Sequence, residues 1–129
     1  MDKIIVVYGH SSVGKTTVIN DIYNQLISNG ATVVSEKKQV GGNIKDFKAV
    51  LSYNEKKVAI LSMGDRKKTV DGCVGKYKGC DVFITAFNMR FATVGSVWLK
   101  NSNAIYKIEK TMANNADNQK VLSAVIAKI

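Results

Sequence analysis

The feature that most constrains the fold is a glycine-rich segment that joins an apolar run to an amphipathic one. Residues 3–8, KIIVVY, are rich in β-branched side chains and predict a buried strand. The segment GHSSVGKTT, residues 9–17, follows directly. Apolar side chains then recur at helical spacing as far as residue 27, and Gly30 supplies a C-terminal stop. The first thirty residues therefore predict a strand, a glycine-rich turn and a helix over about 15–29.

The glycine-rich segment has the chemistry of a phosphate-binding loop. Residues 9–16 match the pattern G-x-x-x-x-G-K-S/T at every position. The glycines allow successive N–H groups to point at phosphate oxygens, while Lys15 can reach the β- and γ-phosphates and the Thr16 hydroxyl can ligate Mg²⁺. The N-terminus of the following helix adds a positive field. The predicted ligand-binding residues are Gly9, His10, Ser11, Ser12, Val13, Gly14, Lys15, Thr16 and Thr17, with His10 contributing its backbone.

On these residues, the segment resembles the Walker A motif of the P-loop NTPase superfamily. The resemblance covers eight motif residues and, with the flanking strand and helix, about thirty. It implies that ATP or GTP binds with Mg²⁺ at the C-terminal edge of a parallel sheet. The rest of the chain is similar in outline to small stand-alone P-loop proteins, and in size to nucleotide kinases, which specifies no reaction.

The remaining pattern predicts an α/β three-layer sandwich with a mainly parallel sheet, P-loop NTPase-like, as one domain over residues 1–129. Two apolar runs separated by a short turn predict an antiparallel hairpin. A polar stretch containing two adjacent glycines predicts a mobile loop. The expected elements after residue 30 are a strand 31–35, a loop 37–45, hairpin strands 47–53 and 57–63, a helix 65–79, a strand 81–87, a helix 90–99, a strand 104–111 and a helix 118–128.

An acidic residue that supports the metal is expected after a second apolar strand, as in a Walker B segment. The candidate is the stretch 58–65, VAILSMGD, in which Ser62 follows the apolar residues and Asp65 comes three positions later. Ser62 would hold a metal-bound water, and Asp65 would support the metal or orient an acceptor. A turn or capping role for Asp65 is the alternative. Asp81 is a weaker candidate because it begins its strand.

Cationic side chains that could assist catalysis follow two of the predicted strands. Arg66, Lys67 and Lys68 come after the stretch that ends at Asp65, and Arg90 comes after strand 81–87. At the ligand edge, Arg66 or Arg90 would stabilise charge on a transferring phosphoryl group. A solvated first helical turn for residues 66–68, and a surface ion pair for Arg90, remain alternatives.

Composition and charge bear on three further properties: contact with a polyanion, a metal site and membrane contact. The net charge is +9, and residues 37–78 carry eleven basic and four acidic groups. Such a basic region predicts either a solvated lysine-rich surface or contact with a polyanion such as nucleic acid. Two cysteines and one histidine exclude a His-rich metal site and favour free thiols. No apolar run is long enough for a membrane span, and no secretory signal is visible, so we expect a cytoplasmic protein without membrane contact.

The sequence therefore leaves two main alternative functions. The first is Mg²⁺-dependent transfer of the γ-phosphoryl group of ATP to a small acceptor, with Lys15, Asp65, Arg66 and Arg90 as catalytic residues. The second is an ATPase or nucleotide-dependent binding module that acts on nucleic acid through residues 37–78. Nucleotide binding without turnover is a third possibility. ATP is favoured over GTP because the sequence lacks N-K-x-D and D-x-x-G segments.

Overall fold

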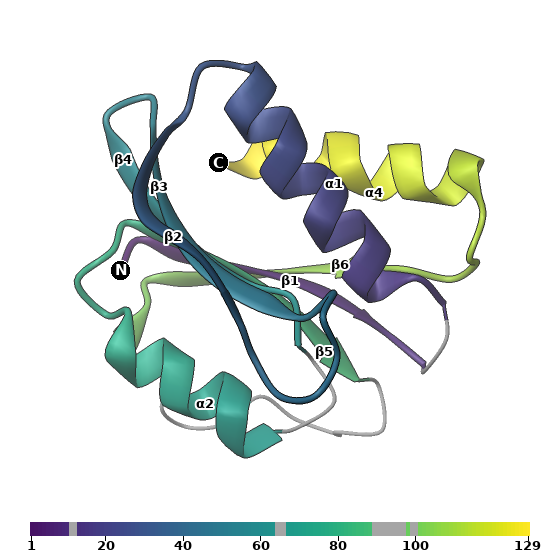
Figure 1. Ribbon diagram of the computed structural model, residues 1–129, viewed down its shortest axis with the longest axis horizontal. Coiled ribbons are helices and arrows are strands. Elements are labelled where there is room, and N and C mark those ends of the chain that lie inside the picture. The colour runs from purple at the N-terminus through teal and green to yellow at the C-terminus, as the bar shows by residue number, and fades with distance from the viewer. Residues whose placement is uncertain (11–12, 64–66, 89–97, 99–100) are drawn as a thin grey trace.

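A six-stranded mixed sheet forms the centre of the structure, a computed structural model that describes residues 1–10, 13–63, 67–88, 98 and 101–129 (Figure 1). The strand order is β2-β3-β4-β5-β1-β6. The elements are β1 (Lys3–Gly9), α1 (Lys15–Ser28), β2 (Thr32–Gln39), β3 (Phe47–Tyr53), β4 (Lys56–Leu61), α2 (Lys67–Lys76), β5 (Val82–Asn88), β6 (Ala104–Glu109) and α4 (Asn115–Lys128).

The sheet has a parallel half and an antiparallel half. Strands β4, β5, β1 and β6 run parallel to one another, whereas β3 is antiparallel to β4 and β2 is antiparallel to β3. The predicted hairpin is confirmed: β3 and β4 are joined through Asn54 and Glu55, whose φ angles are 50° and 65°, as a tight two-residue turn requires. Because β2 is antiparallel to β3, it runs in the same direction as β4, so β3 is the one strand of this sheet that departs from the predicted common direction.

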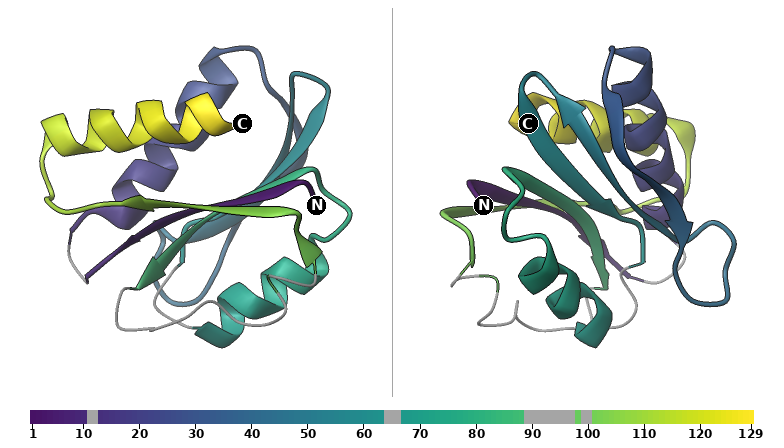
Figure 2. Two further views of the ribbon diagram at one scale, coloured as in Figure 1. Left: turned by 180° about the vertical axis from the view of Figure 1, so that it is seen from behind. Right: turned by 60° about the vertical axis from the view of Figure 1, so that its left-hand side comes forward.

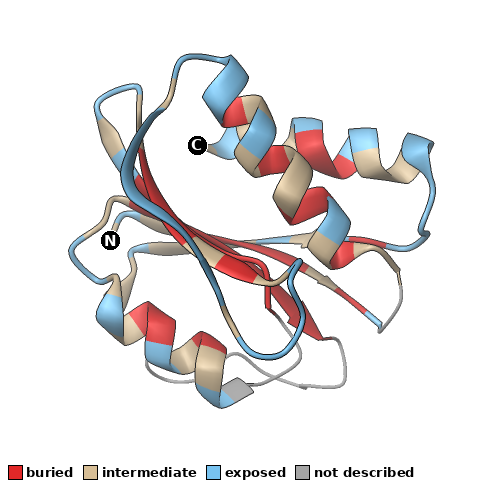
Figure 3. Cartoon of the chain, in the orientation of Figure 1, coloured by how far each residue is buried: buried red, intermediate tan, exposed pale blue. Residues whose placement is uncertain are grey.

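Helices cover both faces of the sheet, which gives an α/β architecture. Figures 1 and 2 show α1 and α4 on one face and α2 on the other. Alternate residues of the central strands divide between two cores: Ile5 and Val7 of β1 pack with α1 and α4, while Ile4 and Val6 pack with α2. Strand β2 forms one edge of the sheet and is exposed along its whole length (Figure 3).

Three element boundaries differ from the predicted ones by three residues or more. Strand β2 continues to Gln39, well beyond the predicted end at residue 35, because Lys38 pairs with Lys48 of β3. Helix α4 begins three residues earlier than predicted, since the Asn114 side chain caps it by accepting a hydrogen bond from Asp117 N at 2.8 Å. Helix α2 ends at Lys76 rather than at residue 79.

The first helix ends as predicted. Gly30 has a φ of +100°, and the N–H groups of residues 30 and 31 donate to the carbonyl oxygens of Ile27 and Leu26, which is a Schellman motif. Of the predicted helix 90–99, only Trp98 lies within the described residues. In the described part of the chain, no helix combines the length and apolar character that crossing a membrane requires.

Candidate functional site

The segment between β1 and α1 lies at the edge of the sheet where the parallel strands end. Its two glycines are each required by the local geometry. Gly14 has a φ of +88°, in the left-handed region that favours glycine. A Cβ built on Gly9 would lie 2.4 Å from the carbonyl oxygen of Lys110, which follows β6. The segment can therefore turn tightly from strand to helix only with glycine at both positions.

Lys15 is held inside this turn, although it is a charged residue at the start of a helix. Only 7% of its surface is exposed. Its Nζ donates to the carbonyl oxygens of Gly9 and His10, at 3.0 and 2.7 Å. The His10 side chain is exposed, and within the described contacts His10 takes part through its backbone carbonyl oxygen. The ammonium group is thus placed among the backbone groups of the turn.

The N-terminus of α1 differs from that of α4 in its capping residue. Gly14 occupies the capping position of α1 and has no side chain that could accept from the first amide groups, and the first turn contains no acidic residue. Helix α4 instead has Asn114 as its cap and Asp117 in its first turn. The first amide groups of an α-helix are strong donors that need an acceptor. The start of α1 therefore suits an external anion better than the start of α4 does.

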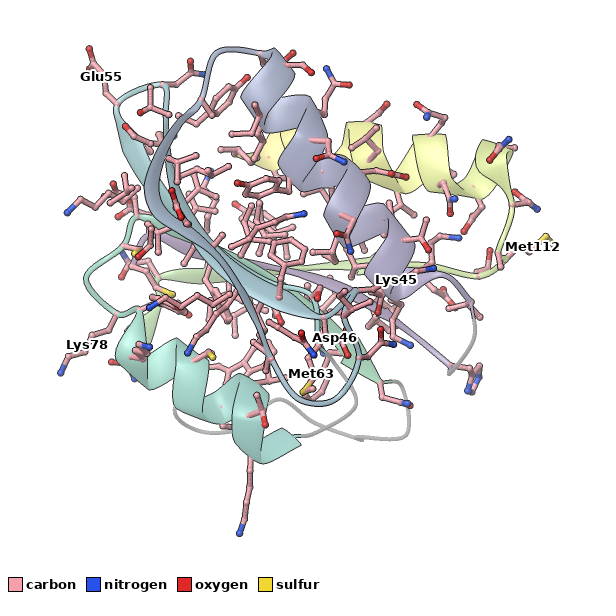
Figure 4. The ribbon with its side chains drawn as sticks, viewed as in Figure 1. Lys45, Asp46, Glu55, Met63, Lys78 and Met112 are labelled. Carbon is pink, nitrogen blue, oxygen red and sulfur yellow. The ribbon has the colours of Figure 1, made fainter. Side chains whose placement is uncertain are left out.

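A carboxylate that the sequence analysis did not single out lies beside the start of α1. Thr16 Oγ1 donates to Asp46 Oδ1 at 3.4 Å, and Ser62 Oγ donates to the same oxygen at 3.4 Å. Asp46 ends the connection between β2 and β3. Figure 4 shows it next to Lys45, near the N-terminal end of α1. Three segments far apart in sequence thus bring two hydroxyl groups and one carboxylate together.

The connection that carries Asp46 is closed by its own hydrogen bonds. Val40 N donates to Asp46 O at 2.9 Å, and Asp46 N donates to Asn43 O at 3.0 Å. Gly41, with a φ of +72°, packs so closely on Met63 that a Cβ there would lie 2.6 Å from its Cε atom. These contacts fix the position of the Asp46 carboxylate relative to the end of β4.

The oxygen set around Asp46 fits Mg²⁺ bound together with a phosphate. Mg²⁺ keeps several waters and is typically held by one or two carboxylates together with substrate phosphates. In the described residues no group of three or more His, Cys, Asp or Glu side chains is arranged to hold a metal ion. A site with Asp46 and the Thr16 hydroxyl as protein ligands needs no such group.

The structure describes two of the three other residues that were considered as metal supports, Ser62 and Asp81, and not Asp65. Ser62 is fully buried, and its Oγ accepts a hydrogen bond from Phe47 N at 2.7 Å, so it braces the start of β3 next to Asp46. Asp81 lies at the opposite edge of the sheet, as predicted, where its carboxylate accepts a hydrogen bond from Lys57 N at 2.8 Å. Asp65 lies outside the described residues.

Some of the remaining predicted site residues lie in the turn or on the first turns of α1 and α2, and the others lie outside the described residues. Val13 is half-buried against Gly9, and Thr17 is exposed on the first turn of α1. Lys68, one of the predicted cations, is exposed on the first turn of α2. The predicted residues Ser11, Ser12, Arg66 and Arg90 lie outside the described part of the chain.

An ion pair between a buried lysine and a half-buried aspartate lies next to the turn. Lys110, 1% exposed, forms a salt bridge of 2.8 Å with Asp117 and also donates to Met112 O. The hydrogen bond from Lys110, with further bonds from the backbone of residues 111 and 112, lowers the pKa of Asp117 well below its usual range. This pair shapes the segment that packs on Gly9.

Comparison of the chain with protein-family models, with curated proteins and with solved structures found no match. The arrangement of side chains must therefore indicate the chemistry by itself. It combines a helix start with glycine at the capping position, a lysine held in the preceding turn, and a carboxylate beside a threonine hydroxyl. Together these groups can bind a phosphorylated anion and a divalent cation.

Proposed function

We propose that the chain binds a nucleoside triphosphate with Mg²⁺ at residues 9–17 and Asp46, and that ATP is the nucleotide. The observation that carries the proposal is the contact between Thr16 Oγ1 and Asp46 Oδ1, beside a glycine-rich turn that holds Lys15. A phosphate-binding turn alone would explain the glycines. The carboxylate next to the threonine hydroxyl adds the oxygen ligands that a metal-bound triphosphate needs.

Each residue of the site has a distinct task in this proposal. Lys15 exchanges contacts with the carbonyl oxygens of Gly9 and His10 for contacts with phosphate oxygens. The first amide groups of α1 donate to the same anion. Thr16 and Asp46 hold the metal ion, and Ser62 keeps Asp46 in place. When bound, Mg²⁺ supplies positive charge against the β- and γ-phosphates.

We further propose that the site activates the γ-phosphoryl group for transfer to a small acceptor. An ammonium group and a carboxylate-bound metal at one end of a triphosphate favour the spread of negative charge in such a transfer. Hydrolysis of ATP uses the same groups with water as the acceptor. Use of ATP rather than GTP rests on the sequence, which has no N-K-x-D segment.

Thermal unfolding with nucleotides tests the proposal. Wild type and Lys15→Ala are compared with ATP, GTP and ADP, each with and without Mg²⁺. Ligand at 100 times its dissociation constant adds about 2.7 kcal/mol to the free energy of unfolding, which raises Tm by roughly 8–15 °C for a chain of this size. We expect that shift with ATP and Mg²⁺ for the wild type, and little or none for Lys15→Ala.

Lys120→Ala is the matched control because Lys120 is an exposed lysine of α4. It removes the same charge and should keep the full ATP-induced shift. Since Lys15 also bonds the turn itself, the quantity compared is the shift caused by nucleotide, not the Tm of the free variant. Absence of a shift with any nucleotide in the wild type would contradict the proposal. Release of inorganic phosphate, or its transfer to candidate acceptors, then separates turnover from binding alone.

A further inference from the structure

A cluster of three lysines lies on the face of the sheet that α2 covers. Lys38 of β2 and Lys48 of β3 are directly opposite each other in the antiparallel ladder. Lys76 is the last residue of α2. All three line one small cavity of about 70 Å³, together with Ser35, Glu36, Ala49 and Tyr77. We call these three residues the lysine cluster.

The lysine cluster faces away from the turn that holds Lys15. Phe47, Ala49 and Leu51 of β3 pack in the core with α1, whereas Val50 packs in the core with α2. Because side chains alternate along a strand, Lys48 shares the face of Val50. The cluster and the proposed nucleotide site are therefore separate surfaces, and the inference below does not rest on the proposed function.

Like charges are close together in the cluster, which is unfavourable without a counter-ion. Like charges directly opposite on neighbouring strands are destabilising. The pKa of Lys48 is lowered, mainly by its side-chain contact with Lys76 and then by the charge of Lys76. Burial raises the pKa of the neighbouring Cys73 thiol, so this group stays neutral. Glu36 is the one acidic residue among those that line the cavity.

Lys37, the residue before Lys38, has a different environment from the lysine cluster. The ammonium group of Lys37 lies 4.5 and 4.4 Å from the ring centres of Tyr23 and Phe47, and donates to Asn20 Oδ1 at 3.3 Å. Its charge is thus balanced by protein groups on the other face of the sheet. Lys76 lies 5.6 Å from the ring centre of Tyr77, a longer contact of the same kind, and the three cluster lysines line a cavity with more basic than acidic side chains.

We propose that the lysine cluster binds a phosphate group. The cavity volume is about twice the roughly 30 Å³ that a water molecule occupies in the liquid, so the cavity has room for a single tetrahedral anion. Lysine ammonium groups are point charges that suit a phosphate approached from several sides. The phosphate belongs either to a small phosphorylated molecule or to the backbone of a nucleic acid, and both present the same chemistry.

Titration of the ¹⁵N-labelled chain tests this proposal. The probes are sodium phosphate and a 12-nucleotide single-stranded DNA, each compared with sodium chloride at equal ionic strength. We expect shifts of the amide signals of residues 48 and 76. Lys48→Gln and Lys76→Gln should weaken binding of the active probe at least about fivefold, because each loses a hydrogen bond to a charged group.

Lys107→Gln is the matched control, since Lys107 is an exposed lysine of β6 at the other edge of the sheet. It should bind like the wild type. Binding of phosphate alone identifies a small phosphorylated ligand. Binding of DNA alone identifies a nucleic-acid backbone, and the slope of log K against log salt should then fall by about 0.7 for each lysine removed. No localised shift with either probe, or an equal loss in Lys107→Gln, would overturn the proposal.

The Tm of Lys76→Gln in phosphate-free buffer, compared with that of the wild type, gives a second and independent test of the proposal. Lys76→Gln removes a like charge, so its Tm in chloride buffer should rise by about 1–4 °C. Added phosphate should raise the Tm of the wild type more than that of the variant. A lower Tm for Lys76→Gln in chloride would mean that the contact of Lys76 with the Tyr77 ring outweighs its repulsion by the other two lysines, and the proposal would fail. Lys15→Ala should leave phosphate binding here unchanged, so this proposal and the proposed function can fail separately.

Discussion

Replacing Asp46 by Asn should have opposite effects on nucleotide binding with and without Mg²⁺. The substitution keeps the shape of the side chain and an oxygen that can accept from Thr16 and Ser62. Both contacts with Asp46 Oδ1 are 3.4 Å long, at the weak end of the hydrogen-bond range. The free variant should therefore stay within about 0.5 kcal/mol of the wild type in its free energy of unfolding.

The loss of ATP binding with Mg²⁺ follows from the proposed role of Asp46 as a metal ligand. Removing a group that supports a bound metal typically weakens its affinity 10- to 100-fold. At an ATP concentration of 100 times the wild-type dissociation constant, a 30-fold loss lowers the stabilisation from about 2.7 to about 0.9 kcal/mol. The Tm shift caused by ATP with Mg²⁺ should thus fall from roughly 8–15 °C to about 3–5 °C.

Without Mg²⁺, the effect of Asp46→Asn on ATP affinity should have the opposite sign. The Asp46 carboxylate repels the triphosphate when no metal neutralises it, so Asp46→Asn should bind metal-free ATP at least as tightly as the wild type does. Thermal unfolding and calorimetric titration, in Mg²⁺ and in EDTA, measure both effects. Asp2→Asn is the control, because Asp2 is exposed just before β1, at the opposite edge of the sheet. Equal binding of ATP with Mg²⁺ by Asp46→Asn and wild type would refute the metal role of Asp46.

Two further substitutions test the supports of the turn. Gly9→Ala places a Cβ 2.4 Å from the Lys110 carbonyl oxygen and should lower the free energy of unfolding by about 1–3 kcal/mol in urea, whereas Gly42→Ala, which meets nothing within 4 Å, should be near neutral. The pKa of Asp117 is lowered in the folded chain, so its contribution to stability is present above its unfolded pKa of about 3.9 and disappears as the pH falls below that value. Thermal unfolding from pH 6 to pH 2 should show a steeper loss for wild type than for Asp117→Asn, and equal slopes would contradict the assignment.

The elements that the sequence predicted well are those with a buried face. Strand β1 and helix α1 have apolar side chains at the spacing of a strand and of a helix, and both lie where they were predicted. Strand β2 was predicted too short because all of its residues are exposed, so its second half carries no apolar signal. Pairing with β3 along one edge, rather than burial, defines that half.

The candidate site was predicted in part for a related reason. The glycine-rich turn is contiguous in sequence, so its pattern could be read directly. Asp46 lies thirty residues from Thr16 and precedes an apolar strand, whereas the pattern used to predict the metal ligand places an acid after one. The predicted hairpin already contained the missing signal, since the start of an antiparallel strand must lie beside the end of its partner. Ser62 N donates to Phe47 O at 2.9 Å, which shows that proximity directly.

The topology of the sheet explains why a carboxylate of the candidate nucleotide site and a lysine of the lysine cluster both lie at the start of β3. In a fully parallel sheet, only residues that follow strands reach the C-terminal edge. An antiparallel strand brings the residues that precede it, and its own first residues, to that same edge. Asp46 thus reaches the start of α1, and Lys48, two positions later, reaches the side of α2. Between them the buried Phe47 holds β3 to β4 through Ser62, so a shift of this strand start would move both side chains together.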